Sequence, residues 1–187
     1  MAVETHEVAL YGMKQYMKRR HTMEVDTPEK ANALVRRWLT DRAYLVGEEA
    51  GKDVHFQYAA RSRIGMNFVV VQPRALVRSV LVIATLTLHP EHFKALQGME
   101  GRERHKLIMD IRYGLLFSEA AFRTEPPDGD VINSVVFEVE LAYDALSEGR
   151  LMDAMSSVQR GLLYVVWKLT DALGKAQSGR DYDMMVQ

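Results

Sequence analysis

The fold is decided by one stretch in the first half of the chain, VHFQYAARSRIGMNFVVVQPRALVRSVLVIATLTL (residues 54–88). Over residues 54–60, large apolar side chains alternate with polar or small ones, which is the period of a strand with one buried face. Residues 66–72 are rich in β-branched side chains, and residues 79–88 are apolar at nearly every position, so we expect that strand to be central. Because parallel crossovers need a dozen or more residues and these connections are shorter, the stretch predicts an antiparallel meander.

Two further strands are predicted on either side of this meander. Residues 43–48 form a short strand before it. Residues 131–143 alternate over a long run, with Val135 and Phe137 on one face and Glu138 and Glu140 on the other. A lone strand leaves its backbone groups unpaired, so residues 131–143 must rejoin the first sheet. The sheet therefore has about five strands.

Helices are predicted both before and after the meander. The run Asp26-Thr27-Pro28-Glu29 is a strong helix start, since Asp26 or Thr27 can accept the free backbone N–H groups and proline suits the first turn. Apolar residues then recur at helical spacing, which predicts a helix over residues 28–41. Helical pieces follow over 90–98 and 102–122, then an exposed loop over 123–130 and a long helix over 147–175. The fold class is α+β, an antiparallel sheet packed against two or three helices.

The same patterns predict a core and a domain organisation. Residues 1–25 form an N-terminal extension with a helix over 3–20, residues 26–175 form one α+β domain, and residues 176–187 form a polar tail. The apolar faces predict the following buried side chains: Trp38, Phe56, Phe68, Val82, Ile111, Phe137 and Leu162.

Composition excludes several classes of function. The chain has no cysteine, which removes thiol nucleophiles, disulfide frameworks and thiolate zinc sites. Its formal net charge is −1, so no overall field draws it to nucleic acid or anionic lipid. The first residues do not resemble a secretory signal, and no apolar run reaches the roughly 20 residues of a membrane-spanning helix. We expect a cytoplasmic protein without a membrane partner.

Candidate chemical groups are sparse. His89 and His92 are three residues apart on a helix, with His105 as a third ligand to consider, but the spacing matches no metal motif and we expect no metal. Glu138 and Glu140 share one face of a strand, which suits an acid–base pair but is more typical of a solvent-facing strand edge. No nucleophile motif or phosphate loop is present, so we expect no catalytic residue and no cofactor.

Nucleic-acid binding has one candidate region. A basic cluster with aromatic neighbours occupies the N-terminal extension, and further arginines lie in the turns of the meander. These residues are Tyr11, Lys14, Tyr16, Lys18, Arg19, Arg20, His21, Arg61, Arg63, Arg74 and Arg78.

Four stretches carry a resemblance to known proteins: VRRWL (35–39), FVVVQP (68–73), IRYGLL (111–116) and YDAL (143–146). Over about residues 27–175 the chain resembles a family of archaeal domains of unknown function, and its layout is similar to the small type III secretion chaperones. The chaperone resemblance implies a homodimer that binds an extended segment of a partner along hydrophobic grooves, without a cofactor. Those chaperones are usually acidic, whereas this chain is near neutral.

The leading hypothesis is a non-enzymatic, chaperone-like protein-interaction module that binds a partner polypeptide as a homodimer. The long helix is apolar over more of its circumference than a sheet can cover, so its second side needs the N-terminal helix or a second subunit. The predicted partner-binding residues are Trp167, Leu163, Val166 and Met155. Alternatives are a nucleic-acid-associated protein that uses the basic N-terminal segment, and an enzyme with no recognisable motif.

Overall fold

The computed structural model describes residues 25–173, and in that part of the chain it forms a six-stranded sheet with four α-helices. The strands are β1 (Leu45–Glu48), β2 (Val54–Arg61), β3 (Asn67–Pro73), β4 (Ser79–Thr87), β5 (Ala121–Glu125) and β6 (Ser134–Ala142). The helices are α2 (Pro28–Asp41), α3 (Pro90–Gly98), α4 (Gly101–Leu115) and α5 (Glu148–Ala172), with a 3₁₀ turn at Tyr143–Ala145. The predicted α+β class is confirmed.

The sheet is antiparallel throughout, in the order β1-β2-β3-β4-β6-β5. β1 to β4 form the predicted meander, and β6 returns to pair with β4 along its whole length, from Ser79 opposite Ala142 to Thr87 opposite Ser134. The predicted central position of β4 is therefore confirmed. The predicted N-terminal helix over 3–20 and the tail over 176–187 lie outside the described residues.

Local sequence explains where the two best-defined helices begin. Thr27 Oγ1 accepts a hydrogen bond from the backbone N–H of Lys30 at 3.3 Å, and Pro28 opens α2. Ser147 Oγ does the same for the N–H of Arg150 at 3.3 Å, which starts α5. In both cases a hydroxyl satisfies a backbone donor that has no partner inside the helix.

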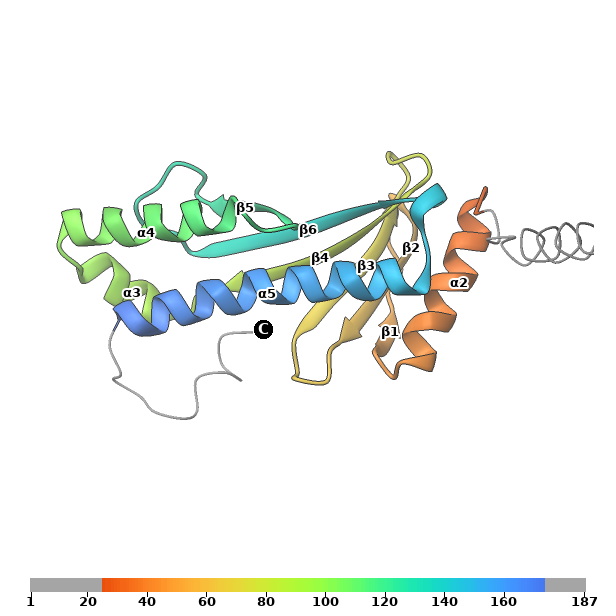
Figure 1. The fold of residues 1–187 in the computed structure, drawn as a ribbon, viewed down its shortest axis with the longest axis horizontal. Coiled ribbons are helices and arrows are strands. Elements are labelled where there is room, and N and C mark those ends of the chain that lie inside the picture. The colour runs from red at the N-terminus through yellow and green to blue at the C-terminus, as the bar shows by residue number, and fades with distance from the viewer. Residues whose placement is uncertain (1–24, 174–187) are drawn as a thin grey trace, which may run out of the picture.

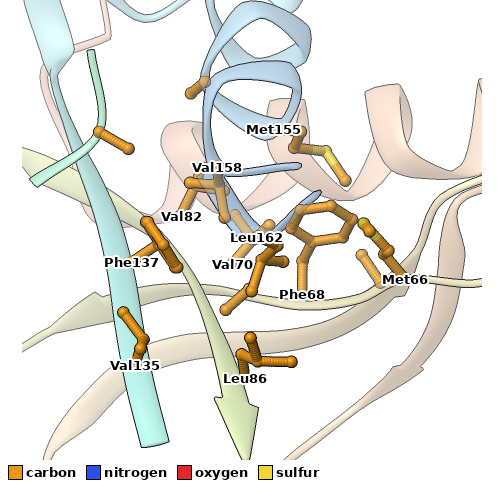
Figure 2. Packing of buried hydrophobic residues seen from close by; sticks show 14 of the residues in the cluster. Met66, Phe68, Val70, Val82, Leu86, Val135, Phe137, Met155, Val158 and Leu162 are labelled. Atoms are coloured by element: carbon orange, nitrogen blue, oxygen red, sulfur yellow. The ribbon is translucent and has the colours of Figure 1, made fainter. Parts of the chain in front are cut away.

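The core lies between the sheet and α5, which runs along β4 and β6, while α2 covers the end of the sheet that carries β1 and β2 (Figure 1). Figure 2 shows Val158 and Leu162 of α5 among side chains of β3, β4 and β6, including Val70, Val82 and Phe137. All seven predicted core residues are at most 8% exposed, so that prediction is confirmed. On the other face of the sheet Thr85, Thr87 and Glu140 are exposed.

The prediction was wrong for residues 116–125. The helix predicted over 102–122 ends at Leu115, and the loop predicted over 123–130 begins with a strand. The helical spacing predicts that Phe122 lies on a helix face, but Phe122 of β5 instead pairs with Phe137 of β6. β5 exists because the outer edge of β6 offers its backbone groups a partner. Two strands therefore lie between α4 and α5.

Among the described residues, helix α4 packs against the second side of α5, a contact that the sequence did not predict. The N-terminal helix lies outside the described residues, and a second subunit stays a prediction. The Tyr164 hydroxyl of α5 donates a 3.2 Å hydrogen bond to the carbonyl oxygen of Asp110 in α4. Val166 and Met155 of α5 are each 3% exposed.

One glycine sets how closely α5 approaches the sheet. A Cβ atom at Gly161 would lie 2.5 Å from Cε1 of the Phe137 ring, which is fully buried. Alanine is usually favoured over glycine inside a helix by about 1 kcal/mol. The glycine at this position therefore reflects the close contact and not helix propensity.

We predict that Gly161→Ala lowers the free energy of unfolding by about 1–3 kcal/mol, because a fixed ring must shift to admit the new methyl group. The matched control is Gly149→Ala in the same helix, where an added Cβ meets nothing within 4 Å and stability should be unchanged or slightly raised. Urea unfolding of both variants gives the comparison. Equal effects of the two substitutions would contradict the close-contact explanation.

Candidate functional site: a groove along helix α5

Two of the most exposed aromatic side chains of the described residues lie where α4 and α5 meet: Phe117, which is 91% exposed, and Trp167, which is 57% exposed. Tyr113 and Leu116, near the end of α4, are also exposed. Three other exposed apolar residues lie in β1 or in turns of the meander and are separate from this cluster: Val46, Ile64 and Val77. Soluble proteins rarely leave aromatic side chains clustered in water, so the α4–α5 junction is the candidate binding surface.

This junction contains a groove of about 560 Å³. Its walls are the end of α4, the segment that follows it, and one side of α5, and its lining residues are Gly114, Leu115, Phe117, Ser118, Glu119, Ser157, Arg160, Gly161, Leu163, Tyr164 and Trp167. Gly114 allows α4 to come close to α5 here, since a Cβ atom at that position would overlap the Tyr164 hydroxyl. The aromatic residues make this end of the groove apolar.

The groove continues into a second, polar hollow of about 360 Å³. Glu119, Ser157 and Arg160 line both hollows, and Arg150 and Asp153 extend the lining toward the start of α5. The lining positions on α5 recur every three or four residues, so they form one stripe along the helix. We call the two hollows together, from Arg150 to Trp167, the α5 groove.

A charged triad joins the two ends of the α5 groove. The Ser157 hydroxyl donates to Glu119 Oε2 at 2.6 Å, and Arg160 Nη2 donates to the same carboxylate oxygen at 2.9 Å. Arg160 Nη2 also lies 2.9 Å from Ser157 Oγ, which accepts from it. The hydrogen bond from Ser157, followed by the positive charge of Arg160, lowers the pKa of Glu119 below its ordinary value.

Part of the edge of β6 forms a wall of the polar hollow. β5 pairs with Ser134 to Glu138 only, so among the described residues no strand pairs with residues 139–142 on that side. Val139 and Leu141 of this open edge line the hollow. A strand edge without a partner strand, beside a groove, is a feature that binds an extended peptide as an added strand.

Two of the four residues predicted to bind a partner lie in the groove. Trp167 and Leu163 line it, whereas Val166 and Met155 are buried in the core and face no open surface. The sequence prediction missed Phe117. The available signal was weak: Tyr113, Leu116 and Phe117 have helical spacing but lie beside the buried stripe of α4, so they had no partner in the predicted core.

The other candidate sites do not assemble. No group of three histidine, aspartate or glutamate side chains within residues 25–173 is placed to hold a metal ion. His89 and His92 make an edge contact with ring centroids 6.2 Å apart, while Nδ1 of His105 lies 2.8 Å from Asp130. Glu138 lies 3.4 Å from Nη1 of Arg123.

The basic candidates for nucleic-acid binding are likewise separated. Arg61 and Arg63 lie at the β2–β3 turn, and Arg74 and Arg78 lie at the β3–β4 connection, which is the opposite end of the sheet. The basic N-terminal residues lie outside the described part of the chain. Across residues 25–173, no helix has the length and apolar character needed to cross a membrane.

We predict that Ser157→Ala raises the pKa of Glu119 toward its ordinary value, because it removes the strongest interaction with the ionised carboxylate. Since the folded-state pKa is lowered, the triad should be intact above the ordinary glutamate range and should be lost as the pH falls through the lowered value. Titration of the Glu119 carboxyl carbon by NMR measures both effects.

Ser156→Ala is the matched control for this titration. The Ser156 hydroxyl donates to the carbonyl oxygen of Met152 within its own helix, at 2.8 Å, and should leave the pKa of Glu119 unchanged. A Glu119 pKa that does not respond to Ser157→Ala would show that the triad does not form in solution.

The comparisons with known proteins agree with the fold and assign no activity. An uncharacterised protein from the archaeon Methanothermobacter thermautotrophicus has a crystal structure that superposes with a TM-score of 0.73 at 23% sequence identity. The match covers 77% of this chain and 99% of that one, and at this identity it shows the fold alone. No curated protein matches. Neither this structure nor the family named in the next sentence is described as a type III secretion chaperone, so that resemblance stays a prediction. The model of a family described as an uncharacterised conserved protein, DUF2299, matches residues 31–169, and the chain belongs to this family.

Proposed function

We propose that the protein is a non-enzymatic, chaperone-like interaction module that binds an extended, apolar segment of a partner polypeptide in the α5 groove. The observation that carries the proposal is the exposure of Phe117 and Trp167, at 91% and 57%, in the walls of one groove. The two side chains line one groove beside a well-packed core, which supports a binding role for that surface.

The groove has the physical properties that polypeptide binding requires. Aromatic side chains at the centre of an interface often supply most of its binding energy, and burying apolar surface contributes about 25 cal/mol per Å². The open edge at residues 139–142 would hold the backbone of an extended ligand, while the aromatic end would hold its side chains. The triad between the two ends supplies polar groups that fix the ligand's position.

A non-enzymatic role is supported by the arrangement of the reactive groups. The best-placed hydroxyl, that of Ser157, is bonded to a carboxylate and a guanidinium and has no histidine beside it in those contacts. We propose a cytoplasmic location on the basis of the composition. The alternatives, a nucleic-acid-associated protein or an enzyme, are outcomes that a binding experiment with nuclease treatment and an activity screen would reveal.

We predict that Phe117→Glu weakens binding of short, unstructured peptides with alternating aromatic and aliphatic residues by at least about tenfold, since the charge would lie in the apolar end of the groove. Peptides with serine at the apolar positions should not bind. Fluorescence anisotropy with labelled peptides measures the dissociation constants.

Val77→Glu is the matched control, because Val77 is also exposed, at 82%, but lies in the β3–β4 connection. It should bind the apolar peptides like the wild type. If Phe117→Glu and Val77→Glu behave alike, with unfolding midpoints unchanged, the α5 groove is not the binding surface.

We further propose that the protein is a homodimer. Tyr113 on α4 and Leu116, which caps that helix, are exposed but do not line the groove, so a second copy could cover them and leave the groove free. A two-fold interface needs only one such self-complementary surface.

We predict a two-chain mass by sedimentation equilibrium at tens of micromolar protein, and a one-chain mass for Leu116→Glu. Trp167→Glu separates the two surfaces, because a groove residue should not change the mass. A wild-type mass of one chain would rule out the dimer, and a monomeric Trp167→Glu variant would place the second copy in the groove instead.

A further inference from the structure

We propose that residues 174–187 of the chain itself occupy the α5 groove when no partner is bound, and so act as an intramolecular competitor. This inference rests on the proposed function, since it concerns the same groove. It identifies a regulating ligand that the chain already carries. Four observations support it: where this segment begins, how far it reaches, which side chains it holds and which charges it meets.

The segment begins beside the apolar end of the groove. α5 ends at Ala172, and Leu173 caps it. Trp167 lies five positions before Ala172, which is about 8 Å along a helix that rises about 1.5 Å per residue. The N-terminal segment joins the domain at α2, at the other end of the sheet from α4 (Figure 1). Of the two segments outside the described residues, the C-terminal one therefore joins the domain at a point closer to this end of the groove.

The segment is long enough to turn back after α5 and place its last residues at the apolar end of the groove. Fourteen residues follow Leu173 in the sequence, and an extended chain spans up to about 3.3 Å per residue, or roughly 46 Å. The α5 groove runs from Trp167 back to Arg150, which is about 26 Å of helix. The chain must reverse direction after α5, and Gly174 or the Ser178-Gly179 pair provides residues suited to such a turn.

The side chains of the segment match the groove. The region predicted as a polar tail contains four apolar residues near its end: Tyr182, Met184, Met185 and Val186. Methionine adapts to irregular apolar surfaces, such as the one that Phe117, Leu163 and Trp167 form. Four apolar side chains within five positions suit an apolar groove better than they suit water.

The charges are also complementary. Asp181 and Asp183 flank Tyr182 in the segment. Lys168 follows Trp167 at the apolar end of the groove, and its Nζ lies 5.9 Å from the centroid of the Tyr164 ring. Lys168 forms no ion pair with another described residue. The two aspartates beside Tyr182 therefore carry the charge that Lys168 would attract.

Tethering makes even weak binding effective. A short flexible connection gives a ligand an effective concentration in the millimolar range. A segment that would bind only weakly as a separate peptide is then bound much of the time. A partner must displace it, so the apparent affinity of the groove for the partner falls by the fraction of molecules in which the groove is free.

The first experiment locates the segment in the full-length protein. Because the chain has no cysteine, Gln187→Cys gives one site for a nitroxide spin label. We expect paramagnetic broadening of the NMR signals of Phe117, Leu163 and Trp167, and none at Val77. In a variant with Tyr182, Met184, Met185 and Val186 all replaced by serine, the broadening should disappear. No broadening at the groove in the wild-type background would overturn the proposal.

A mixed sample distinguishes one chain from two. Isotope-labelled protein without a nitroxide is combined with unlabelled protein that carries it. Broadening of groove signals in the mixture, equal to that in the doubly labelled protein, would mean that the segment of a second copy fills the groove, which contradicts the intramolecular proposal. Absence of broadening in the mixture supports it.

The second experiment tests competition with a defined probe, a synthetic peptide of residues 180–187. The tetra-serine variant should bind this peptide at least about tenfold more tightly than the wild type, because its own segment no longer competes. Phe117→Glu in the tetra-serine background should remove the binding. Equal affinities of wild type and tetra-serine variant would refute the competitor while leaving the groove intact. If neither the wild type nor the tetra-serine variant binds the apolar peptides described above, the proposed function is refuted instead.

Discussion

The contact between Gly161 and the ring of Phe137 is the constraint on which the rest of the structure depends. It brings the middle of α5 close to β6, where only hydrogen atoms fit between the helix backbone and the buried ring. At this separation Leu162 and Val158 reach side chains of three strands (Figure 2). The position of α5 also determines where α4 can pack, because Tyr164 must cross Gly114 to bond with Asp110. The groove is the space left between these fixed elements.

Most of the sheet was predictable because its signal is local. Alternation in β2, the apolar run of β4 and the short connections are all properties of neighbouring residues, and they specify an antiparallel meander without knowledge of the rest of the chain. β5 was not predictable in this way. The helical spacing of Ile111 and Leu115 continues to Phe122, so periodicity alone gives no end to α4. The strand forms because the edge of β6 is available to it, and that edge lies far away in the sequence.

The candidate site was half predictable for a related reason. The width of the apolar face on α5 indicated that something besides the sheet must cover it, and Trp167 and Leu163 do lie outside the core. The same pattern cannot say which neighbour covers which residue, and Val166 and Met155 are buried in the core. Phe117 lies between α4 and β5, in a segment without regular structure. The helical spacing of the sequence continues through this segment, so the pattern did not mark Phe117 as exposed, and its exposure became visible only in three dimensions.

The short pairing of β5 also bears on how long a ligand would stay bound. β5 ends its pairing at Glu138 and leaves only residues 139–142 of the edge open. So few residues offer an added strand a small number of backbone hydrogen bonds, each with a modest net contribution in water. Most differences in affinity between related complexes arise from the dissociation rate. A ligand held by such a short ladder would therefore leave quickly unless its side chains matched the aromatic end. The backbone contact would then serve to sample many sequences, and the lifetime of each complex would report how well the side chains fit.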